Sequence, residues 1–326
     1  MSKRQQKSDY DLLVERCQSV IRVGSKSFSL SAHLFGKEKR DGAFLLYSWC
    51  RYCDDEIDKA SASETPEQLE QRLASLRELT ESSYSSTPMN HPVFAAFQHV
   101  VRKYEVPRHY PFELLEGMAM DIRREDYPNL NKLVLYSYRV AGCVGLMMSH
   151  VMGVSSDKAL QHASDMGIAM QLTNISRDVF EDASMNRVYL PEDWLREEGI
   201  PKAAIREACN TPKLVRVVAR LLDVADGYYA SGDAGLKYLS LRSACTVASA
   251  RYVYAEIGNR VRSRGIHAWS SRTWVSFPRK LWVMALGVFK VFVTRPFGRR
   301  WAPQRIGMVW EHAVMLFSFF VFRSLL

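Results

Sequence analysis

The apolar positions of this chain recur with a helical period along most of its length. From Val93 onward the apolar side chains return every three to four positions, and no stretch alternates convincingly as a strand. The pattern predicts helices over Val93–Tyr104, Tyr110–Arg124, Asn131–Met152, Asp157–Ala183, Lys213–Gly232 and Arg242–Arg264. Asp9–His33 and Glu67–Glu81 have the same amphipathic pattern. We therefore expect an all-α fold, a single-domain bundle of packed helices.

One predicted helix contains a polar stripe with apolar neighbours. The segment Tyr47–Asp58 reads Y-S-W-C-R-Y-C-D-D-E-I-D. Each residue of a helix advances by roughly 100°, so four polar side chains fall within roughly 60° of one another. This first acidic stripe consists of Tyr47, Arg51, Asp54 and Asp58. Carboxylates in an apolar helix are costly unless something positive meets them, which indicates a binding site rather than a solvated face.

A second acidic stripe follows in Gln171–Asp182, which reads Q-L-T-N-I-S-R-D-V-F-E-D. Its members lie within roughly 80° of arc and are Gln171, Asn174, Asp178 and Asp182. Oxygen ligands from two facing helices suit Mg2+, with Mn2+ as the alternative. Because Mg2+ keeps several waters and completes its shell with phosphate oxygens, we expect a diphosphate substrate in a central cavity between the stripes.

Length and composition agree with this picture. The chain has 326 residues, of which 47% are hydrophobic, enough for a sizeable core in one or two domains. Its first residues, Met1–Asp9, are polar and charged, which favours a cytoplasmic protein. Cys50 and Cys53 form a lone C-x-x-C, a pattern that also occurs in zinc and redox sites. With no second pair and a helix running through them, they are predicted to be buried thiols.

Several further blocks accompany the two stripes in a fixed order. They are G-S-K-S-F at Gly24–Phe28, E-G-M-A-M-D at Glu116–Asp121, Y-S-Y-R-V-A-G-C-V-G at Tyr136–Gly145 and N-R-V-Y-L-P at Asn186–Pro191. With these blocks, the chain resembles the head-to-head prenyl synthases, the family of phytoene, dehydrosqualene and squalene synthases. The resemblance runs from about Cys17 to about Lys280 and is strongest to the bacterial phytoene synthase branch.

The resemblance implies an isoprenoid-synthase-type bundle and a prenyltransferase activity. Two geranylgeranyl diphosphates would condense through prephytoene diphosphate to phytoene, the first committed step of carotenoid biosynthesis, without NADPH. A dehydrosqualene or squalene synthase that uses farnesyl diphosphate is the alternative. A non-catalytic assembly protein with the same fold is the alternative from another class, although a scaffold has no reason to bury intact acids.

The site residues follow from the stripes and from the resemblance. The expected metal ligands are Asp54, Asp58, Asn174, Asp178 and Asp182, assisted by Arg51 and Arg177. The resemblance implies that the following residues contact the substrate, its diphosphates or the intermediate: Ser25, Ser27, Phe28, Tyr47, Tyr136, Gln171, Tyr254 and Arg272. The tyrosines could instead be satisfied core residues, and Asp121 could cap a helix or pair with Arg123 and Arg124.

Positive charge gathers at the C-terminal end. Residues 251–326 hold 13 Lys and Arg against two acids, a net charge of +11, so the preceding 250 residues carry −2 of the total +9. No nucleic-acid recognition motif accompanies this charge, and aromatic residues interleave with it. Nucleic acid is therefore not an expected partner.

The last part of the chain combines this charge with two apolar runs. Leu281–Val293 and Ala313–Phe322 are separated by Arg295, Arg299, Arg300 and Arg305. Neither run reaches the about 20 apolar residues that a membrane-spanning helix needs. We predict a catalytic region over 1–280 and a tail over 281–326 that lies on an anionic membrane surface, near other carotenoid enzymes. The alternative is that these runs are core helices that close the bundle.

Overall fold

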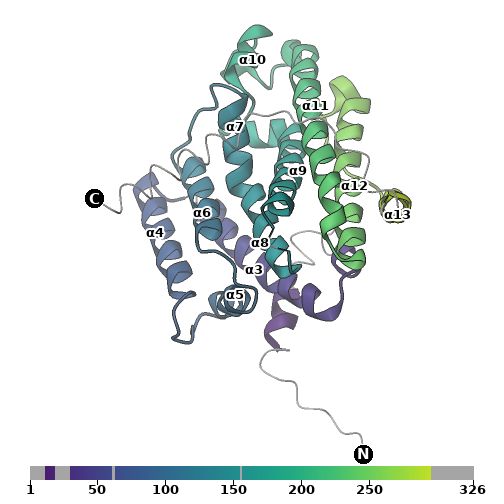
Figure 1. The fold of residues 1–326 in the computed structure, drawn as a ribbon. Helices are drawn as coiled ribbons and strands as arrows, with labels where there is room; N and C mark the ends of the chain where they lie inside the picture. The colour runs from purple at the N-terminus through teal and green to yellow at the C-terminus, as the bar shows by residue number, and fades with distance from the viewer. Residues whose placement is uncertain (1–11, 19–29, 61–62, 155, 295–326) are drawn as a thin grey trace, which may run out of the picture.

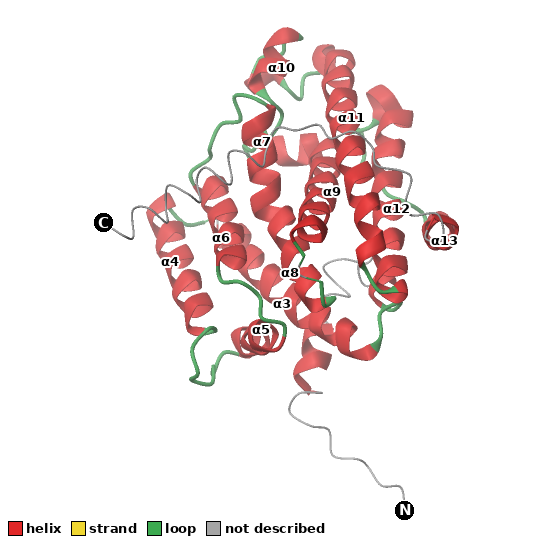
Figure 2. Ribbon diagram, viewed as in Figure 1, coloured by secondary structure: helices red, strands yellow, loops and turns green. Residues whose placement is uncertain are grey.

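The computed structural model describes residues 12–18, 30–60, 63–154 and 156–294, and Figure 1 shows them as a bundle of helices. Eleven α-helices have defined bounds within these residues: α3 Lys37–Ala60, α4 Pro66–Ser82, α5 Pro92–Lys103, α6 His109–Ile122, α7 Leu130–Ser137, α8 Cys143–Val151, α9 Asp157–Ser184, α10 Glu192–Glu197, α11 Thr211–Gly235, α12 Leu241–Arg264 and α13 Phe277–Thr294. Loops and short helical turns join them, and the described residues contain no strand (Figure 2).

The predicted helices are confirmed to within about one turn at their ends. The one internal difference is in the predicted helix Asn131–Met152, where the π-helical turn η1 (Tyr138–Gly142) separates α7 from α8. The amphipathic segment Asp9–His33 falls largely outside the described residues, although residues 12–18 are helical. The expected all-α, single-domain architecture is confirmed.

Helix α9 lies at the centre of the bundle, where it contacts α7, η1, α8, α11 and α12 (Figure 1). Two hydrophobic cores flank it. One is built by α3 to α6 and α8, where Trp49 stacks on Phe97 with ring centroids 4.1 Å apart. The other packs α7, α9 and α11 through side chains such as Leu172 and Leu221. Both acidic stripes are therefore on long helices that a core holds on one side.

Helix α9 approaches both α8 and the preceding turn η1 backbone to backbone. A β-carbon at Gly145 would collide with the carbonyl group of Ala163, and one at Gly167 would collide with the carbonyl group of Ala141. A glycine in a helix is destabilising by roughly 1 kcal/mol relative to alanine, so its presence here is explained by this close crossing. The crossing fixes the position of α9 relative to α8.

Helix α13 packs on α12 at the edge of the bundle, where Figure 1 shows it end-on. Val283, Met284 and Val291 are buried in this contact, and Gly287 faces the carbonyl group of Ala248. The Lys290 ammonium lies 2.9 Å from the Asp233 carboxylate of α11. The run Leu281–Val293 thus belongs to a helix with one buried face, whereas Ala313–Phe322 lies outside the described residues. None of the described helices is long and apolar enough to cross a membrane.

Candidate active site

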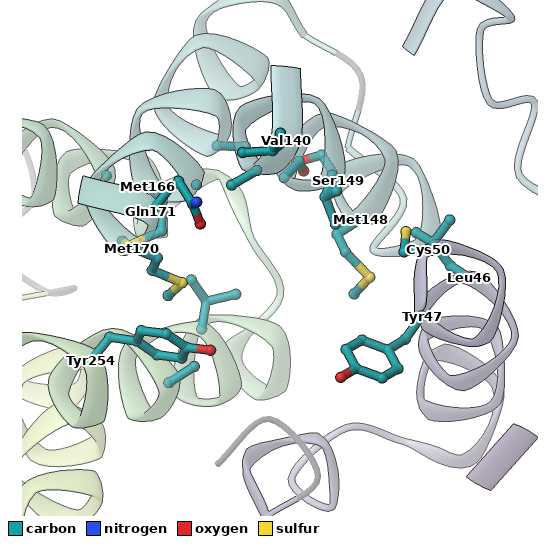
Figure 3. Close-up of a pocket in the computed structure, with 18 of the residues that line it drawn as sticks. Leu46, Tyr47, Cys50, Val140, Met148, Ser149, Met166, Met170, Gln171 and Tyr254 are labelled. Atoms are coloured by element: carbon teal, nitrogen blue, oxygen red, sulfur yellow. The ribbon is translucent and has the colours of Figure 1, made fainter. Parts of the chain in front are cut away.

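An elongated cavity of about 480 Å³ lies between the two cores, and its wall is mostly apolar. Figure 3 shows Tyr47 of α3 and Tyr254 of α12 pointing into it from opposite sides. The thioethers of Met148 and Met170 also face the open space in this view. Methionine is flexible and polarisable, so it forms a wall that can adapt to a long apolar chain.

Seven of the predicted site residues line this cavity: Tyr47, Arg51, Asp54, Tyr136, Gln171, Asn174 and Tyr254. The remaining acids continue the same stripes by about one helical turn, since Asp58 follows Asp54 and Asp178 follows Asn174. We refer to this region, where the two acidic stripes extend past the apolar wall, as the polar end of the cavity. Ser25, Ser27 and Phe28 lie outside the described residues.

In the first acidic stripe, Arg51 forms salt bridges with two carboxylates. The Arg51 NH1 atom lies 3.0 Å from Asp54 Oδ2, and its NH2 atom lies 2.5 Å from Asp55 Oδ1. Nearly half of the Asp54 side chain, 46%, remains accessible. Even so, desolvation by the surrounding protein and the nearby Asp58 raise the pKa of Asp54 to about 6. Burial also raises the pKa of Tyr47 to about 12, so its hydroxyl is protonated at neutral pH.

The second acidic stripe is more enclosed. The Asp178 carboxylate is 14% exposed and accepts hydrogen bonds from Arg177, whose Nε lies 2.8 Å from Oδ1. Arg272, from the segment before α13, places its NH2 atom 3.5 Å from Asp178 Oδ2. Burial and the charge of Asp178 raise the pKa of Asp182 to about 8. Arg272, which the resemblance implied as a substrate contact, therefore lies beside the acids of the second stripe.

Arg187 joins the two acidic stripes, and the sequence analysis did not select it. Its NH2 atom lies 3.0 Å from Asp58 Oδ1 of the first stripe, and its backbone N–H donates to the Asp182 carbonyl of the second. The preceding Asn186 has a φ of 58°, a left-handed conformation that asparagine tolerates well. In the sequence, the only signal for this arginine was its place in the block N-R-V-Y-L-P. The turn that directs it between the two helices depends on tertiary structure, which the local sequence pattern does not specify.

Tyr136 belongs to a buried hydrogen-bond network at the cavity wall. Its hydroxyl donates to Asp121 Oδ2 at 2.8 Å, and the Tyr189 hydroxyl donates to Asp121 Oδ1 at 2.9 Å. Burial raises the pKa of Asp121 to about 6, although Arg187 and the two tyrosines oppose this rise. Tyr136 is thus a satisfied buried tyrosine that also lines the cavity. Asp121 pairs with tyrosines, whereas the Arg123 guanidinium pairs with other acids.

The donor set at the polar end is suited to a hard cation. Among the described residues, no three His, Cys, Asp or Glu side chains form a ready metal-binding cluster. Instead Arg51, Arg177 and Arg187 hold three of the four aspartates. Carboxylate oxygens in two separate groups fit Mg2+, which takes one or two carboxylates per ion and other ligands from water and phosphate.

The two cysteines of the C-x-x-C pattern do not contribute a metal site. Both are free, and Cys53 is fully buried, whereas Cys50 lines the cavity. Burial raises the pKa of Cys50 to about 12, which keeps the thiol protonated. The prediction of buried thiols is therefore confirmed for Cys53, whereas Cys50 is half-buried at the cavity wall.

The sequence of residues 21–279 matches the model of the squalene/phytoene synthase family. The chain belongs to this family. Among its relatives, the 15-cis-phytoene synthase of Pantoea ananas is 39% identical over 307 residues, which is 92% of this chain and 97% of the relative. The 15-cis-phytoene synthase of Paracoccus sp. is 40% identical over 286 residues, 87% of this chain and 93% of the relative.

Solved structures of squalene/phytoene synthase family members share the fold. A dehydrosqualene synthase superposes with a TM-score of 0.79 at 27% sequence identity, covering 87% of this chain and 98% of that one. A squalene synthase from Alicyclobacillus acidocaldarius superposes with a TM-score of 0.72 at 22% identity, covering 80% and 97%. The resemblance that the sequence blocks indicated and the helical architecture are both confirmed.

Proposed function

We propose that this protein is a prenyltransferase that condenses two geranylgeranyl diphosphates head to head into phytoene, the first committed step of carotenoid biosynthesis. The strongest support is that two acidic stripes meet at one end of a long apolar cavity. The polar end suits a diphosphate, and the cavity suits a polyisoprenoid chain. Relatives that are named 15-cis-phytoene synthases and match nearly the whole chain favour the twenty-carbon substrate.

The polar end would stabilise the leaving diphosphate. Mg2+, or Mn2+ in its place, would bind to Asp54, Asp58, Asn174, Asp178 and Asp182 and neutralise charge on the departing group. Arg51 and Arg177 already lie beside these acids, and Arg187 and Arg272 extend the positive charge around them. Guanidinium groups bind phosphate oxygens well, so the same arginines can exchange an aspartate for a diphosphate oxygen.

The cavity would protect the reacting carbons. Ionisation of one substrate releases diphosphate and leaves an allylic carbocation, whose first carbon is attacked by the 2,3 double bond of the second substrate. Loss of a proton from that first carbon then closes the cyclopropane ring of the intermediate, prephytoene diphosphate. This intermediate loses its own diphosphate, rearranges and releases a proton. The apolar wall excludes water from each cation. Tyr47 and Tyr254 face each other across the cavity, where their rings and hydroxyls can orient the chains (Figure 3).

The alternative is a dehydrosqualene or squalene synthase that acts on farnesyl diphosphate. The observation in its favour is the structural similarity to a dehydrosqualene synthase, which covers nearly all of that protein. Both reactions use the same polar end, so the difference lies in the length of the chain that the cavity accepts. A squalene synthase would also need a reductant, whereas the formation of phytoene requires only the loss of a proton.

Product analysis distinguishes these activities. The purified protein is incubated with Mg2+ and with either geranylgeranyl or farnesyl diphosphate, in the presence and absence of NADPH, and the extracted hydrocarbons are identified. We expect phytoene from geranylgeranyl diphosphate, in equal amount with and without NADPH. A thirty-carbon product as the main hydrocarbon, or a product whose formation requires NADPH, would move the assignment to the alternative.

We also propose that the protein is cytoplasmic and associates peripherally with the membrane through its tail, residues 281–326. The tail combines two short apolar runs with Arg295, Arg299, Arg300 and Arg305. Basic segments next to apolar ones bind anionic lipid surfaces, and substrate and product are both poorly soluble in water. Neighbouring carotenoid enzymes at the same membrane are the proposed protein partners.

A further inference from the structure

A second pocket lies between the C-terminal end of α12 and the start of α13, and it shares no lining residue with the central cavity. Its lining includes three guanidinium groups, from Arg260, Arg264 and Arg279, and one carboxylate, from Glu256. These four charges leave the pocket with a net charge of +2. Such a concentration of guanidinium groups is typical of sites that bind phosphate.

The arginines are held in place but retain donors. The Glu256 carboxylate lies 2.8 Å from Arg279 Nε and 3.4 Å from Arg260 Nε, and Arg260 NH1 donates to the Trp274 carbonyl. Arg264 donates from NH1 and NH2 to the segment 270–273. A guanidinium has five N–H donors, so these bonds do not exhaust them. The pocket is therefore a preorganised donor set, not a group of mobile surface side chains.

An exposed apolar surface begins at this pocket. Trp274 at the pocket is 69% exposed, and on α13 the side chains of Trp282 and Phe289 are 58% and 66% exposed. On a helix, Trp282, Phe289 and Val293 lie within roughly 40° of one another, on the face opposite the buried Met284 and Val291. Large contiguous apolar faces on a protein surface indicate an interaction site, and tryptophan is favoured at the boundary between lipid and water.

We infer that this pocket binds the phosphate of an anionic lipid headgroup while the exposed face of α13 enters the same membrane surface. This deepens the proposed membrane association and rests on it. Charge complementarity supports a lipid as the occupant, because the +2 pocket lies at one end of the apolar face and Arg295, Arg299 and Arg300 follow the other end in the sequence. An apolar face beside a cationic pocket matches an anionic bilayer surface.

The pocket adjoins a segment that reaches the polar end of the cavity, so docking there would place the membrane near the substrate site. The short segment that contributes Thr273 and Trp274 to the pocket also contributes Arg272, whose guanidinium contacts Asp178 at the polar end of the cavity. Headgroup binding would therefore hold the membrane surface beside the place where the substrate diphosphates bind. A prenyl diphosphate that partitions into the bilayer presents its diphosphate at that surface.

Vesicle co-sedimentation of the full-length protein tests the inference. The vesicles contain phosphatidylcholine alone or mixed with phosphatidylglycerol. We expect binding to the anionic vesicles, weakened roughly fivefold by Arg279→Gln and more by Trp282→Ser combined with Phe289→Ser. Arg279→Lys should restore much of the binding, because it returns the charge. Arg216→Gln is the matched control, since Arg216 is an exposed arginine of α11 paired with Glu198.

Three results would overturn the inference. If the wild type binds anionic vesicles and the pocket variants bind equally well, the tail alone makes the contact and the proposed membrane association stands. If Arg279→Gln loses binding of inorganic phosphate, measured by calorimetry, but retains vesicle binding, the pocket serves a soluble phosphate. If the Trp282→Ser and Phe289→Ser variant changes only the oligomeric state in sedimentation velocity, a second copy covers the face.

The remaining outcomes distinguish the membrane association, the headgroup site and the enzymatic activity from one another. A wild type that binds no vesicles would overturn both the membrane association and the headgroup site, while leaving the activity unaffected. Phytoene formation from detergent-dispersed substrate should be unchanged in every pocket variant, which also shows that each variant is folded. Loss of vesicle binding with this activity retained supports the inference.

Discussion

In the first acidic stripe about half of each aspartate is accessible, 46% for Asp54 and 48% for Asp58, whereas Asp178 of the second stripe is 14% exposed. Both stripes place two aspartates one helical turn apart, so the sequence pattern is nearly the same. The settings differ because α9 lies between the two cores and contacts α7, η1, α8, α11 and α12, whereas α3 belongs to one core and packs mainly on α5. Aspartates with the same spacing along a helix therefore differ in acidity and in access to solvent.

The enclosed stripe should be the less tolerant of the two. We expect Asp178→Ala and Asp182→Ala to lower kcat by about 10²–10³-fold, with the helical content unchanged, because they delete oxygen ligands and not packing groups. Asp54→Ala and Asp58→Ala should also lose nearly all activity, although by a smaller factor than the α9 variants. The measurement is phytoene formation at saturating substrate, with circular dichroism as the check on folding.

Glu181→Gln provides the matched control for the α9 substitutions. Glu181 is adjacent in sequence to Asp182, but its side chain is 50% exposed and pairs with Arg272 outside the cavity lining. We expect a loss of less than about fivefold. An Asp178→Ala protein with near wild-type turnover would show that the two stripes do not form a shared metal site.

Removing the link between the stripes should have the next largest effect. Arg187→Gln takes away the guanidinium beside Asp58 while the backbone bond to Asp182 remains. We expect activity to fall about 10–100-fold, as is usual when a residue that orients ligands is changed. The apparent Mg2+ requirement should change as well, which a purely structural role would not cause. Arg196→Gln is the control, because Arg196 is an exposed arginine of α10.

The unequal acidities predict a pH-dependent metal requirement. Mg2+ binds to ionised carboxylates, and the pKa of Asp182 is raised to about 8 and that of Asp54 to about 6. The apparent Mg2+ affinity should therefore rise between pH 6 and pH 8, by several-fold. Titration of activity with Mg2+ at fixed pH values measures this. An affinity that is constant over this range would contradict the raised pKa of Asp182.

The smallest expected effect is on stability in the absence of metal. Near pH 7 the folded protein holds a proton on Asp182 that the unfolded chain, with an ordinary aspartate pKa, does not hold. The free energy of unfolding then decreases as pH rises toward the folded pKa of about 8. In chelator, Tm should be a few degrees lower at pH 8 than at pH 6. Asp182→Asn should reduce this difference, since asparagine does not titrate.

Helical periodicity explains which parts of the fold and site were predictable. The ends of α9 and α12 and both acidic stripes follow from the spacing of residues within one helix, so they could be inferred without tertiary information. The link through Arg187 could not, because it depends on a turn that brings residues 129 positions apart into contact. The bond from Tyr136 to Asp121 likewise joins two helices whose relative rotation no local pattern specifies.

Which side chains of a helix are exposed to solvent also could not be predicted from the local sequence pattern. The apolar run Leu281–Val293 is compatible with a core helix or with a membrane-bound one, and α13 has features of both, with Val283 buried and Phe289 exposed. Which face is covered depends on how α12 is placed. Sequence periodicity identifies the stripe on a helix, but not what lies against it.

The close approach of α9 to η1 and α8, at Gly167 and Gly145, also constrains how this cavity can change. Two backbones in direct contact cannot move closer, and separating them would open a gap lined by carbonyl groups. That wall is mechanically stiff, and any side chain added to it would have to push a whole helix. Adaptation to shorter or longer substrates should therefore occur through side chains on the opposite walls, such as Leu46 of α3 and Val247 of α12, which can be exchanged one at a time.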